Sequence, residues 1–404
     1  MGPTGLPVIV IAIALALGAP VATVLTWDLP RLKLVRRVGM LLLCQLLTLV
    51  AGLALVNRAG DFYTSWNELV NTGTPTKVVT GPNVANLVGL PRQLLRRIEP
   101  HVSPLSPLPA SSAGTPPDTA PPGKLDHSLA HLHGTRGRAG SMVVRARILG
   151  PRTRYDLPAL LYLPSEYFQP SFAGTRFPVV EFLAGYPGSP RSWTGMLRLQ
   201  KTLDEEIAAG RMAPTVGVLP AQNPHPPRDS ECVDAVGGGS RAGTYLGEDV
   251  PDVVARELRV RTDPAGWAVM GYSTGGFCAV NLALRHPRRF LTAVSLAGYF
   301  HPITDSTTGD LYRRDRHARD LNDPRYLVRH QPPEVWIYLA ASGGDAAAVR
   351  QIHQFVPLIP DQVHTTVAML PVGGHNPVSW RVLERAAYRW LSDTVGQATV
   401  PATA

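Results

Sequence analysis

Two long apolar runs stand near the N-terminus of the chain. Leu6–Thr26 has no charged residue over 21 positions, and Val38–Val56 has none over 19. As a helix rising about 1.5 Å per residue, the first run would span about 30 Å, the thickness of a bilayer's hydrocarbon core. Residues 1–60 are therefore predicted to form a membrane anchor with two transmembrane helices, about 6–26 and 38–56; a pair of buried core helices is the alternative. A cleaved signal is not favoured, because the first run lacks a basic start and is too long.

Charge between the two runs predicts their orientation. Trp27–Arg37 carries four basic residues and one Asp, a net charge of about +3. Because loops rich in Lys and Arg stay in the cytoplasm, everything after Asn57 is expected outside it. The predicted location is the cell membrane, multi-pass, with the rest of the chain extracytoplasmic.

Residues 61–140 are predicted to be an extracytoplasmic linker. Eight of the 24 residues at 100–123 are proline, with Ser, Ala, Thr and Gly between them, a composition that does not pack a core. A semi-extended tether is expected there. A short helix around Leu90–Ile98 is considered, and the stretch before the tether receives no role.

From Ser141 onward, apolar strand-like runs alternate with helical patterns. Met142–Leu149 and Pro158–Leu163 are predicted to pair, and later strands include Phe177–Leu183, Thr215–Leu219, Trp267–Met270, Phe290–Leu296, Val335–Ala340 and Thr365–Leu370. Helices are predicted between them, among them Leu197–Ala209, Leu246–Leu258, Gly275–Arg285, Ala346–Leu358 and Pro377–Leu391. This order predicts an α/β domain over 141–394 with a mostly parallel sheet and helices on both faces, followed by a tail at 395–404.

The amino-acid composition and the net charge limit the classes of protein to which the chain can belong. Hydrophobic residues make up 45% of the 404 positions and charged residues 17%, which excludes disorder throughout and agrees with a large core plus membrane helices. The net charge of +9 suits an anionic membrane surface, and without interleaved aromatic residues it does not indicate nucleic-acid binding. His127, His131 and His133 are interpreted as solvated loop residues and not as a metal site. The basic residues Arg313, Arg314, Arg316 and Arg319 are interpreted as a solvated face or cap. No cofactor or metal is expected.

The sequence Gly271-Tyr-Ser-Thr-Gly275 falls between a predicted strand and a predicted helix. In G-x-S-x-G the glycines permit a sharp turn that projects the serine above the sheet, so Ser273 is the candidate nucleophile. A serine hydroxyl needs a base, and a third group fixes the tautomer of that base.

The base and the acid are expected after the serine, in the order Ser, acid, His. His375, in Gly373-Gly-His-Asn376, follows a strand and is the candidate base. Asp345 directly follows the strand Val335–Ala340 and is the preferred acid, with Asp305 and Asp310 as competitors. An oxyanion hole needs two N–H donors; Thr274 and Tyr186 are predicted, because Pro187 has no N–H.

These motifs resemble a known family. Phe182-Leu-Ala-Gly-Tyr186, the segment around Ser273 and Gly-Gly-His-Asn resemble the putative-esterase branch of the α/β-hydrolases, which includes S-formylglutathione hydrolases and secreted mycolyltransferases. The resemblance implies an α/β-hydrolase fold, Ser273, Asp345 and His375 as a triad, and Tyr186 and Thr274 as oxyanion donors. The mycolyltransferase loop typically has Asp-Gly-Leu-Arg where this chain has Ala-Gly-Tyr-Pro, so acyl transfer to trehalose does not carry over.

The resulting expectation is a membrane-anchored extracytoplasmic serine esterase that acts on acyl esters or lipids of the cell envelope. An acyltransferase with the same triad and a catalytically silent envelope-binding module are the alternatives. The oligomeric state is not predicted.

Two cysteines are expected in the oxidising compartment. Cys232 lies in the long Gly- and Pro-rich loop, and Cys278 lies five residues after Ser273. Thiols outside the cytoplasm tend to pair, so a disulfide is predicted; the alternative is a buried Cys278 packed as a small apolar residue and a lone Cys232 thiol. Trp193 and Trp380 are assigned equally to the core and to a substrate pocket.

Overall fold

The computed structural model describes residues 2–28, 33–70, 78–80, 134–137 and 140–395. Four features considered from the sequence lie outside these ranges: the Pro-rich tether at 100–123, the short helix at 90–98, the three histidines between 127 and 133, and the tail beyond residue 395. The described ranges hold both apolar helices and the whole of the α/β region predicted over 141–394.

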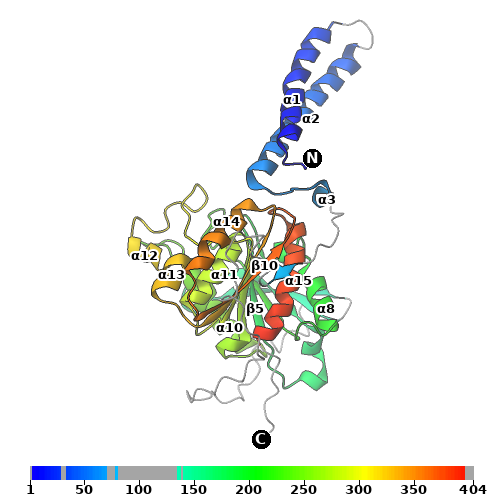
Figure 1. Cartoon of the computed structure of the whole chain (residues 1–404). Coiled ribbons are helices and arrows are strands. Elements are labelled where there is room, and N and C mark those ends of the chain that lie inside the picture. The colour runs from blue at the N-terminus through cyan, green and yellow to red at the C-terminus, as the bar shows by residue number, and fades with distance from the viewer. Residues whose placement is uncertain (1, 29–32, 71–77, 81–133, 138–139, 396–404) are drawn as a thin grey trace.

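A single mixed sheet forms the centre of the domain (Figure 1). In the described residues its order is β1-β10-β9-β8-β7-β5-β6-β4-β3-β2, parallel from β10 to β6 and antiparallel at both ends. The strands are β1 (Val79–Thr80), β2 (Gly134–Arg136), β3 (Met142–Leu149), β4 (Asp156–Leu163), β5 (Val179–Leu183), β6 (Val216–Pro220), β7 (Trp267–Tyr272), β8 (Thr292–Leu296), β9 (Val335–Ser342) and β10 (Val363–Leu370). The central strands are buried along their length, as strands covered on both faces are.

Helices cover both faces of this sheet (Figure 1). The helix α8 (Leu199–Ala208) packs with α15 (Pro377–Thr394) on one face, and α10 (Val250–Glu257), α11 (Thr274–Arg285) and α14 (Ala346–Phe355) lie on the other. The α/β-hydrolase class predicted from the sequence is confirmed. Shorter helices complete the domain: α7 (Pro190–Thr194), α9 (Ala242–Thr244), α12 (Arg316–Asp320), α13 (Pro324–His330) and the turns η3 (Ser165–Phe168), η4 (Pro170–Phe172), η6 (Pro264–Gly266) and η7 (Val356–Leu358).

The helix predicted over 246–258 is not a regular α-helix in the structure. The structure begins it at α9, continues through a wide π turn, η5 (Tyr245–Asp249), and ends α10 at Glu257. Pro251 has no N–H to donate and its ring would clash with the carbonyl four residues earlier in a regular helix. A wider turn before the proline accommodates it.

Both edge strands come from residues assigned to the linker. β1 pairs with β10 and β2 pairs with β3, each in antiparallel register. Strands of two and three residues are too short to display an alternating pattern, so neither strand was predicted.

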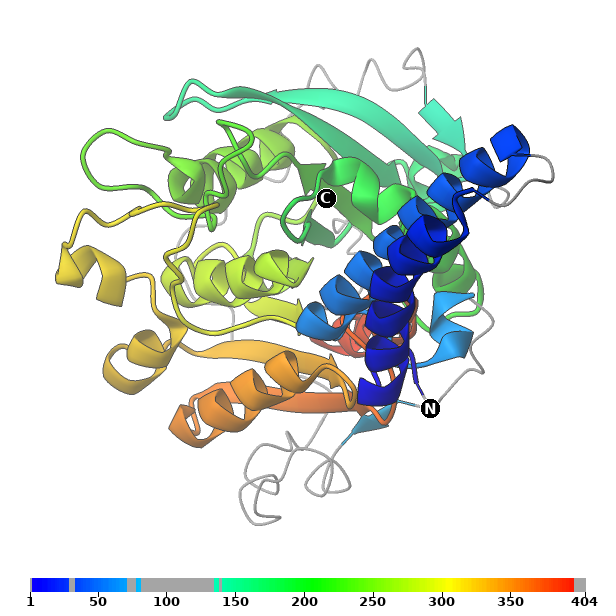
Figure 2. The same ribbon diagram turned by 90° about the horizontal axis from the view of Figure 1, so that it is seen from above.

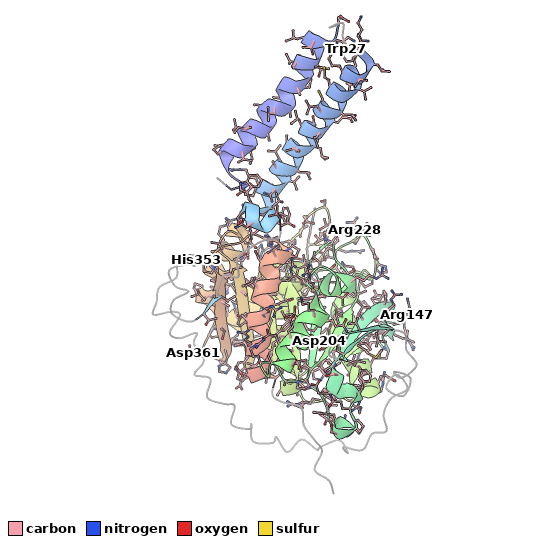
Figure 3. All side chains as sticks on the ribbon, turned by 90° about the vertical axis from the view of Figure 1, so that its right-hand side faces the viewer. Trp27, Arg147, Asp204, Arg228, His353 and Asp361 are labelled. Carbon is pink, nitrogen blue, oxygen red and sulfur yellow. A yellow bond between two sulfur atoms is a disulfide. The ribbon has the colours of Figure 1, made fainter. Side chains whose placement is uncertain are left out.

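The two apolar helices form a hairpin that rises from one end of the domain (Figures 1 and 2). They are α1 (Leu6–Thr26) and α2 (Lys33–Gly60), and both are long and apolar enough to cross a membrane by length and composition. Most of their large apolar side chains are exposed, and Trp27 lies at the end of the hairpin farthest from the domain (Figure 3). At the near end, α2 leads directly into α3 (Trp66–Leu69).

Candidate active site

Ser273 occupies a strained turn between β7 and α11. Its φ of 54° and ψ of −123° lie where non-glycine residues are rare. A Cβ on Gly271 would come within 2.0 Å of the Gly275 carbonyl oxygen, and one on Gly275 within 2.2 Å of the Leu183 carbonyl oxygen. Both glycines are therefore required for the turn to close against β5.

Ser273, His375 and Asp345 form one hydrogen-bonded row. The Ser273 Oγ lies 3.0 Å from His375 Nε2, and His375 Nδ1 lies 2.6 Å from Asp345 Oδ2. Asp345 follows β9, is 1% exposed, and its other oxygen accepts from the Ala348 N–H at 3.0 Å, which caps α14. This row can activate a serine hydroxyl and fix the tautomer of its base.

The two competing acids take part in local turns instead. Asp305 Oδ1 accepts from the Thr307 and Thr308 N–H groups, and Asp310 Oδ1 accepts from the Tyr312 N–H. These contacts are typical of turn-forming aspartates. In the described residues, Asp345 is the carboxylate that contacts His375.

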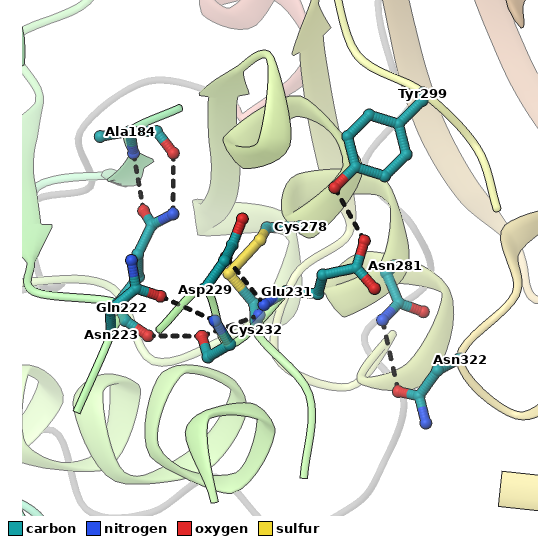
Figure 4. Close-up of a disulfide and its surroundings, with 11 residues drawn as sticks. Ala184, Gln222, Asn223, Asp229, Glu231, Cys232, Cys278, Asn281, Tyr299 and Asn322 are labelled. Carbon is teal, nitrogen blue, oxygen red and sulfur yellow. Dashed lines mark hydrogen bonds between the residues drawn. A yellow bond between two sulfur atoms is a disulfide. The ribbon is translucent and has the colours of Figure 1, made fainter. Parts of the chain in front are cut away.

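The loop after β5 lies over the serine. Gln222 holds Ala184 through two hydrogen bonds of 2.8 Å, one to its N–H and one to its carbonyl (Figure 4). A Cβ on Gly185 would lie 3.0 Å from the Ser273 Cβ. Within the described part of the chain, the backbone N–H groups of Tyr186 and Thr274 donate no hydrogen bond, so both are available to an oxyanion.

Three aromatic rings pack beneath and beside the serine. Tyr272 stacks on Trp380 at 4.6 Å and meets Trp193 edge-on at 5.3 Å. Trp193 is fully buried and packs the core, whereas Trp380 presents its ring to the edge of His375 at 5.0 Å. Trp380 is itself only 6% exposed, so both tryptophans pack in the core.

A disulfide joins Cys232 to Cys278 (Figure 4). The two Cα atoms are 5.5 Å apart, so the long loop after β6 is fixed to α11. The preceding residue, Glu231, is fully buried and accepts from the Tyr299 hydroxyl at 2.8 Å. Burial raises the pKa of Glu231 to about 8.

A cavity of about 510 Å³ lies between this loop and residues 308–313. Arg228, Asp229 and Arg313 contribute to its wall, and the Asp229 carboxylate also interacts with the Thr274 side chain. Asp229 thus links the wall of the cavity to the residue that follows the serine. Among the described residues, no three His, Cys, Asp or Glu side chains gather as metal ligands would.

The loop that carries His375 is held by residues that sequence reasoning left without a role. The connecting segment, residues 61–69, runs from the end of α2 through α3. The His375 N–H donates to the Asp61 carbonyl at 2.8 Å, the Gly374 N–H donates to Glu68 Oε1 at 2.9 Å, and Phe62 meets the His375 ring edge-on. The capping pattern Ser65-x-x-Glu68 was a readable signal of a helix start, but it did not reveal this contact.

Comparison with known proteins agrees with this architecture. The fold is that of the α/β-hydrolases, and Ser273 lies between a strand and a helix. The family model described as putative esterase matches residues 151–357, about half of the chain, and the protein belongs to that family.

Curated relatives match over part of their length. An uncharacterized Corynebacterium glutamicum protein is 24% identical over 250 residues, 59% of this chain and 57% of the relative. The Mycobacterium leprae MPT51 antigen is 36% identical over 159 residues, 34% of this chain and 52% of the antigen. The iron(III) enterobactin esterase of Dickeya dadantii is 27% identical over 220 residues, 50% of this chain and 46% of that enzyme. The chain thus spans about half the length of these relatives.

Solved structures share the fold. An S-formylglutathione hydrolase from Agrobacterium tumefaciens superposes with a TM-score of 0.56 at 16% identity, over 66% of this chain and 99% of that one. A ferulic acid esterase superposes with a TM-score of 0.55 at 17% identity, over 63% of this chain and 99% of that one.

Proposed function

We propose that the protein is a membrane-anchored serine esterase that acts through an acyl-enzyme on Ser273. The observation that carries the proposal is the row Ser273–His375–Asp345 beside two unused backbone N–H groups. Such a site supplies a nucleophile, a base and an oxyanion hole together.

Acylation would begin at the ester carbonyl. His375 Nε2 takes the Oγ proton as Ser273 attacks the carbonyl carbon, and the Tyr186 and Thr274 N–H groups bind the oxyanion of the tetrahedral intermediate. Asp345 holds the imidazole and stabilises its positive charge. The carbon–oxygen bond to the alcohol then breaks, and His375 returns the proton to the departing alkoxide.

Deacylation repeats these steps with water. His375 removes a proton from water, the resulting hydroxide attacks the acyl carbon, and Ser273 Oγ leaves with the proton from His375 to give the free acid. An acceptor alcohol in place of water would transfer the acyl group instead, and this acyltransferase reaction is the second candidate. The cavity bordered by Arg228 and Arg313 offers space for such an acceptor, and its wall residue Asp229 contacts the Thr274 side chain.

The proposed substrates are acyl esters of the cell envelope that lie at the bilayer surface. Supporting this, the Asp61 carbonyl, one residue beyond the end of α2, binds the backbone of His375, so the site stands at the end of a helix apolar enough to span a membrane. Phe62 and Trp66 are 38% and 49% exposed there, and aromatic side chains favour the membrane interface.

The proposed orientation leaves the domain outside the cytoplasm. The basic loop at residues 27–37 is the supporting observation, and two spans then return the chain to the outer side. Single cysteines introduced into a chain with Cys44→Ala should be protected from an impermeant thiol reagent at residues 27–37 and labelled at 100–123. The reverse labelling would contradict the orientation.

The activity is tested with the full-length chain in lipid nanodiscs and an envelope lipid extract. Mass spectrometry should find free acyl acids that Ser273→Ala does not produce. New acyl esters in place of free acids would establish the acyltransferase, and unchanged lipids would favour a silent binding module.

A further inference from the structure

The connecting segment and the His375 loop contact each other along their whole length. Besides the bonds from the His375 and Gly374 N–H groups, the Asn376 side-chain amide donates to the Phe62 carbonyl and to Glu68 Oε1, and the Ser379 hydroxyl donates to Glu68 Oε1 at 3.1 Å. These partners are separated by more than 300 positions in the sequence. A segment that enters the domain from α2 therefore forms the support of the base.

Glu68 is the centre of this contact. It is 7% exposed, and each of its oxygens accepts from three donors. Oε1 faces the His375 loop, with Gly374, Asn376 and Ser379 as its donors; Oε2 faces its own segment, with the Thr64 N–H, the Thr64 hydroxyl and the Ser65 N–H as its donors.

This set of partners favours an ionised carboxylate. Four of the six partners are N–H groups that can only donate, two at each oxygen, so a glutamine would turn its NH2 group toward two N–H groups whichever way its amide is oriented. Burial opposes the charged form, but the hydrogen bonds from Gly374, Asn376 and Thr64 outweigh it, and the pKa of Glu68 lies below its ordinary value. The side chain is therefore charged at neutral pH.

The opposite side of the contact is fitted to the segment as well. A Cβ on Gly374 would lie 2.2 Å from the Asp61 carbonyl oxygen and 2.3 Å from that of Phe62. Both are backbone atoms of the connecting segment, so an alanine at 374 would push the two apart. Gly374 provides a second way to disturb the contact without changing Glu68.

We propose that Glu68 is a positioning residue for His375, through which the chain leaving α2 sets the geometry of the base. This inference rests on the proposed esterase function. Because the base must meet Ser273 Oγ within hydrogen-bond distance, a displacement of about 1 Å in its loop would lower turnover about 100-fold. Catalytic competence is thereby tied to the anchored segment.

The test uses full-length protein in nanodiscs and a short-chain soluble ester, with turnover expressed per site labelled to completion by a fluorophosphonate. Glu68→Gln and Gly374→Ala should each lower kcat about 10- to 100-fold with KM changed less than about twofold. Asn67→Ala, at an exposed neighbouring position, should stay within about twofold of wild type.

Hydrogen–deuterium exchange gives a readout that does not depend on activity. The Gly374 and His375 N–H groups donate to the connecting segment, so the peptide containing them should exchange faster in Glu68→Gln and unchanged in Asn67→Ala. Unchanged exchange and unchanged kcat in Glu68→Gln would overturn the proposal, as would an equal loss of kcat in Asn67→Ala. A wild-type chain without turnover would instead refute the esterase function, and the exchange comparison would still decide whether Glu68 holds the loop.

Discussion

The serine and the histidine of the candidate triad are held in place by different means. Ser273 stands on a turn whose parts are adjacent in sequence, with β7 before it, α11 after it and two glycines that admit the neighbouring carbonyls. His375 stands on a loop whose N–H groups are bound by residues 61–69. One position is encoded locally, and the other depends on a segment at the opposite end of the chain.

Ser273 and His375 should therefore be displaced by different substitutions. A strained turn persists only where the surrounding structure forces it, and here the turn is packed between buried strands. The His375 loop has its support on a short segment beside the apolar hairpin, with fewer buried contacts around it. Substitutions within the Ser273 turn should therefore displace the serine directly. The position of His375 should instead depend on residues 61–69, which are remote from it in the sequence.

The largest effect is expected from the acid that orients the base. Asp345→Asn should lower kcat on the order of 10⁴-fold, because an amide presents the wrong partner to His375 Nδ1 while still capping α14. Asp305→Asn is the matched control, since Asp305 bonds its own turn. Similar losses of kcat in both variants would show that Asp345 does not orient His375.

Next comes the glycine that lets the turn close. Gly275→Ala should lower kcat about 100-fold or more, since its Cβ would collide with the Leu183 carbonyl and displace Ser273 relative to the oxyanion donors. Gly174→Ala provides the comparison, because no heavy atom lies within 4 Å of a Cβ there. Wild-type kinetics in Gly275→Ala would show that the turn is not as tightly fitted as described.

A smaller effect, on stability, is expected from the disulfide behind the turn. The bond closes a sequence separation of 46 residues, for which the chain-entropy model gives on the order of 4 kcal/mol. Replacing Cys232 and Cys278 together by alanine should lower the melting temperature, with kcat at low temperature nearly retained. The comparison is the wild-type protein with reductant, which should melt like the double variant if the bond is accessible to reduction. An unchanged melting temperature in both would contradict a stabilising bond.

The smallest expected effect is on stability, depends on pH, and concerns Glu231. Its pKa is about 8 when folded and near 4.5 when unfolded, so the folded state binds more protons between these values and the free energy of unfolding falls as pH rises from 4.5 to 8. Glu231→Gln removes this loss. The melting temperature of the variant relative to wild type should rise between pH 5 and pH 8; a constant difference would mean that Glu231 stays charged in the fold.

The contrast between the two regions also explains what the sequence could predict. The nucleophile turn, the order of the triad and the alternation of strands and helices follow from local patterns, and the α/β-hydrolase class predicted from them is confirmed. The roles of Ser273, Asp345, His375, Tyr186 and Thr274 stay predictions that the geometry supports.

Long-range contacts were beyond the reach of those patterns. Glu68 received no role from the sequence, because its partners in the His375 loop lie 306 to 311 positions away. The pairing of β1 with β10 was missed because a strand of two residues shows no alternating pattern. The wide π turn before Pro251 was not predicted either, since it is one of several ways to accommodate a proline.

Ser273 is the proposed activated nucleophile of this site. Full-length protein in nanodiscs is treated with a fluorophosphonate, digested, and the labelled peptide is sequenced by mass spectrometry. One adduct is expected, on Ser273, absent from Ser273→Ala and formed far more slowly in His375→Ala. Equal labelling of Ser273→Ala, or an adduct on another serine in the wild-type chain, would contradict it.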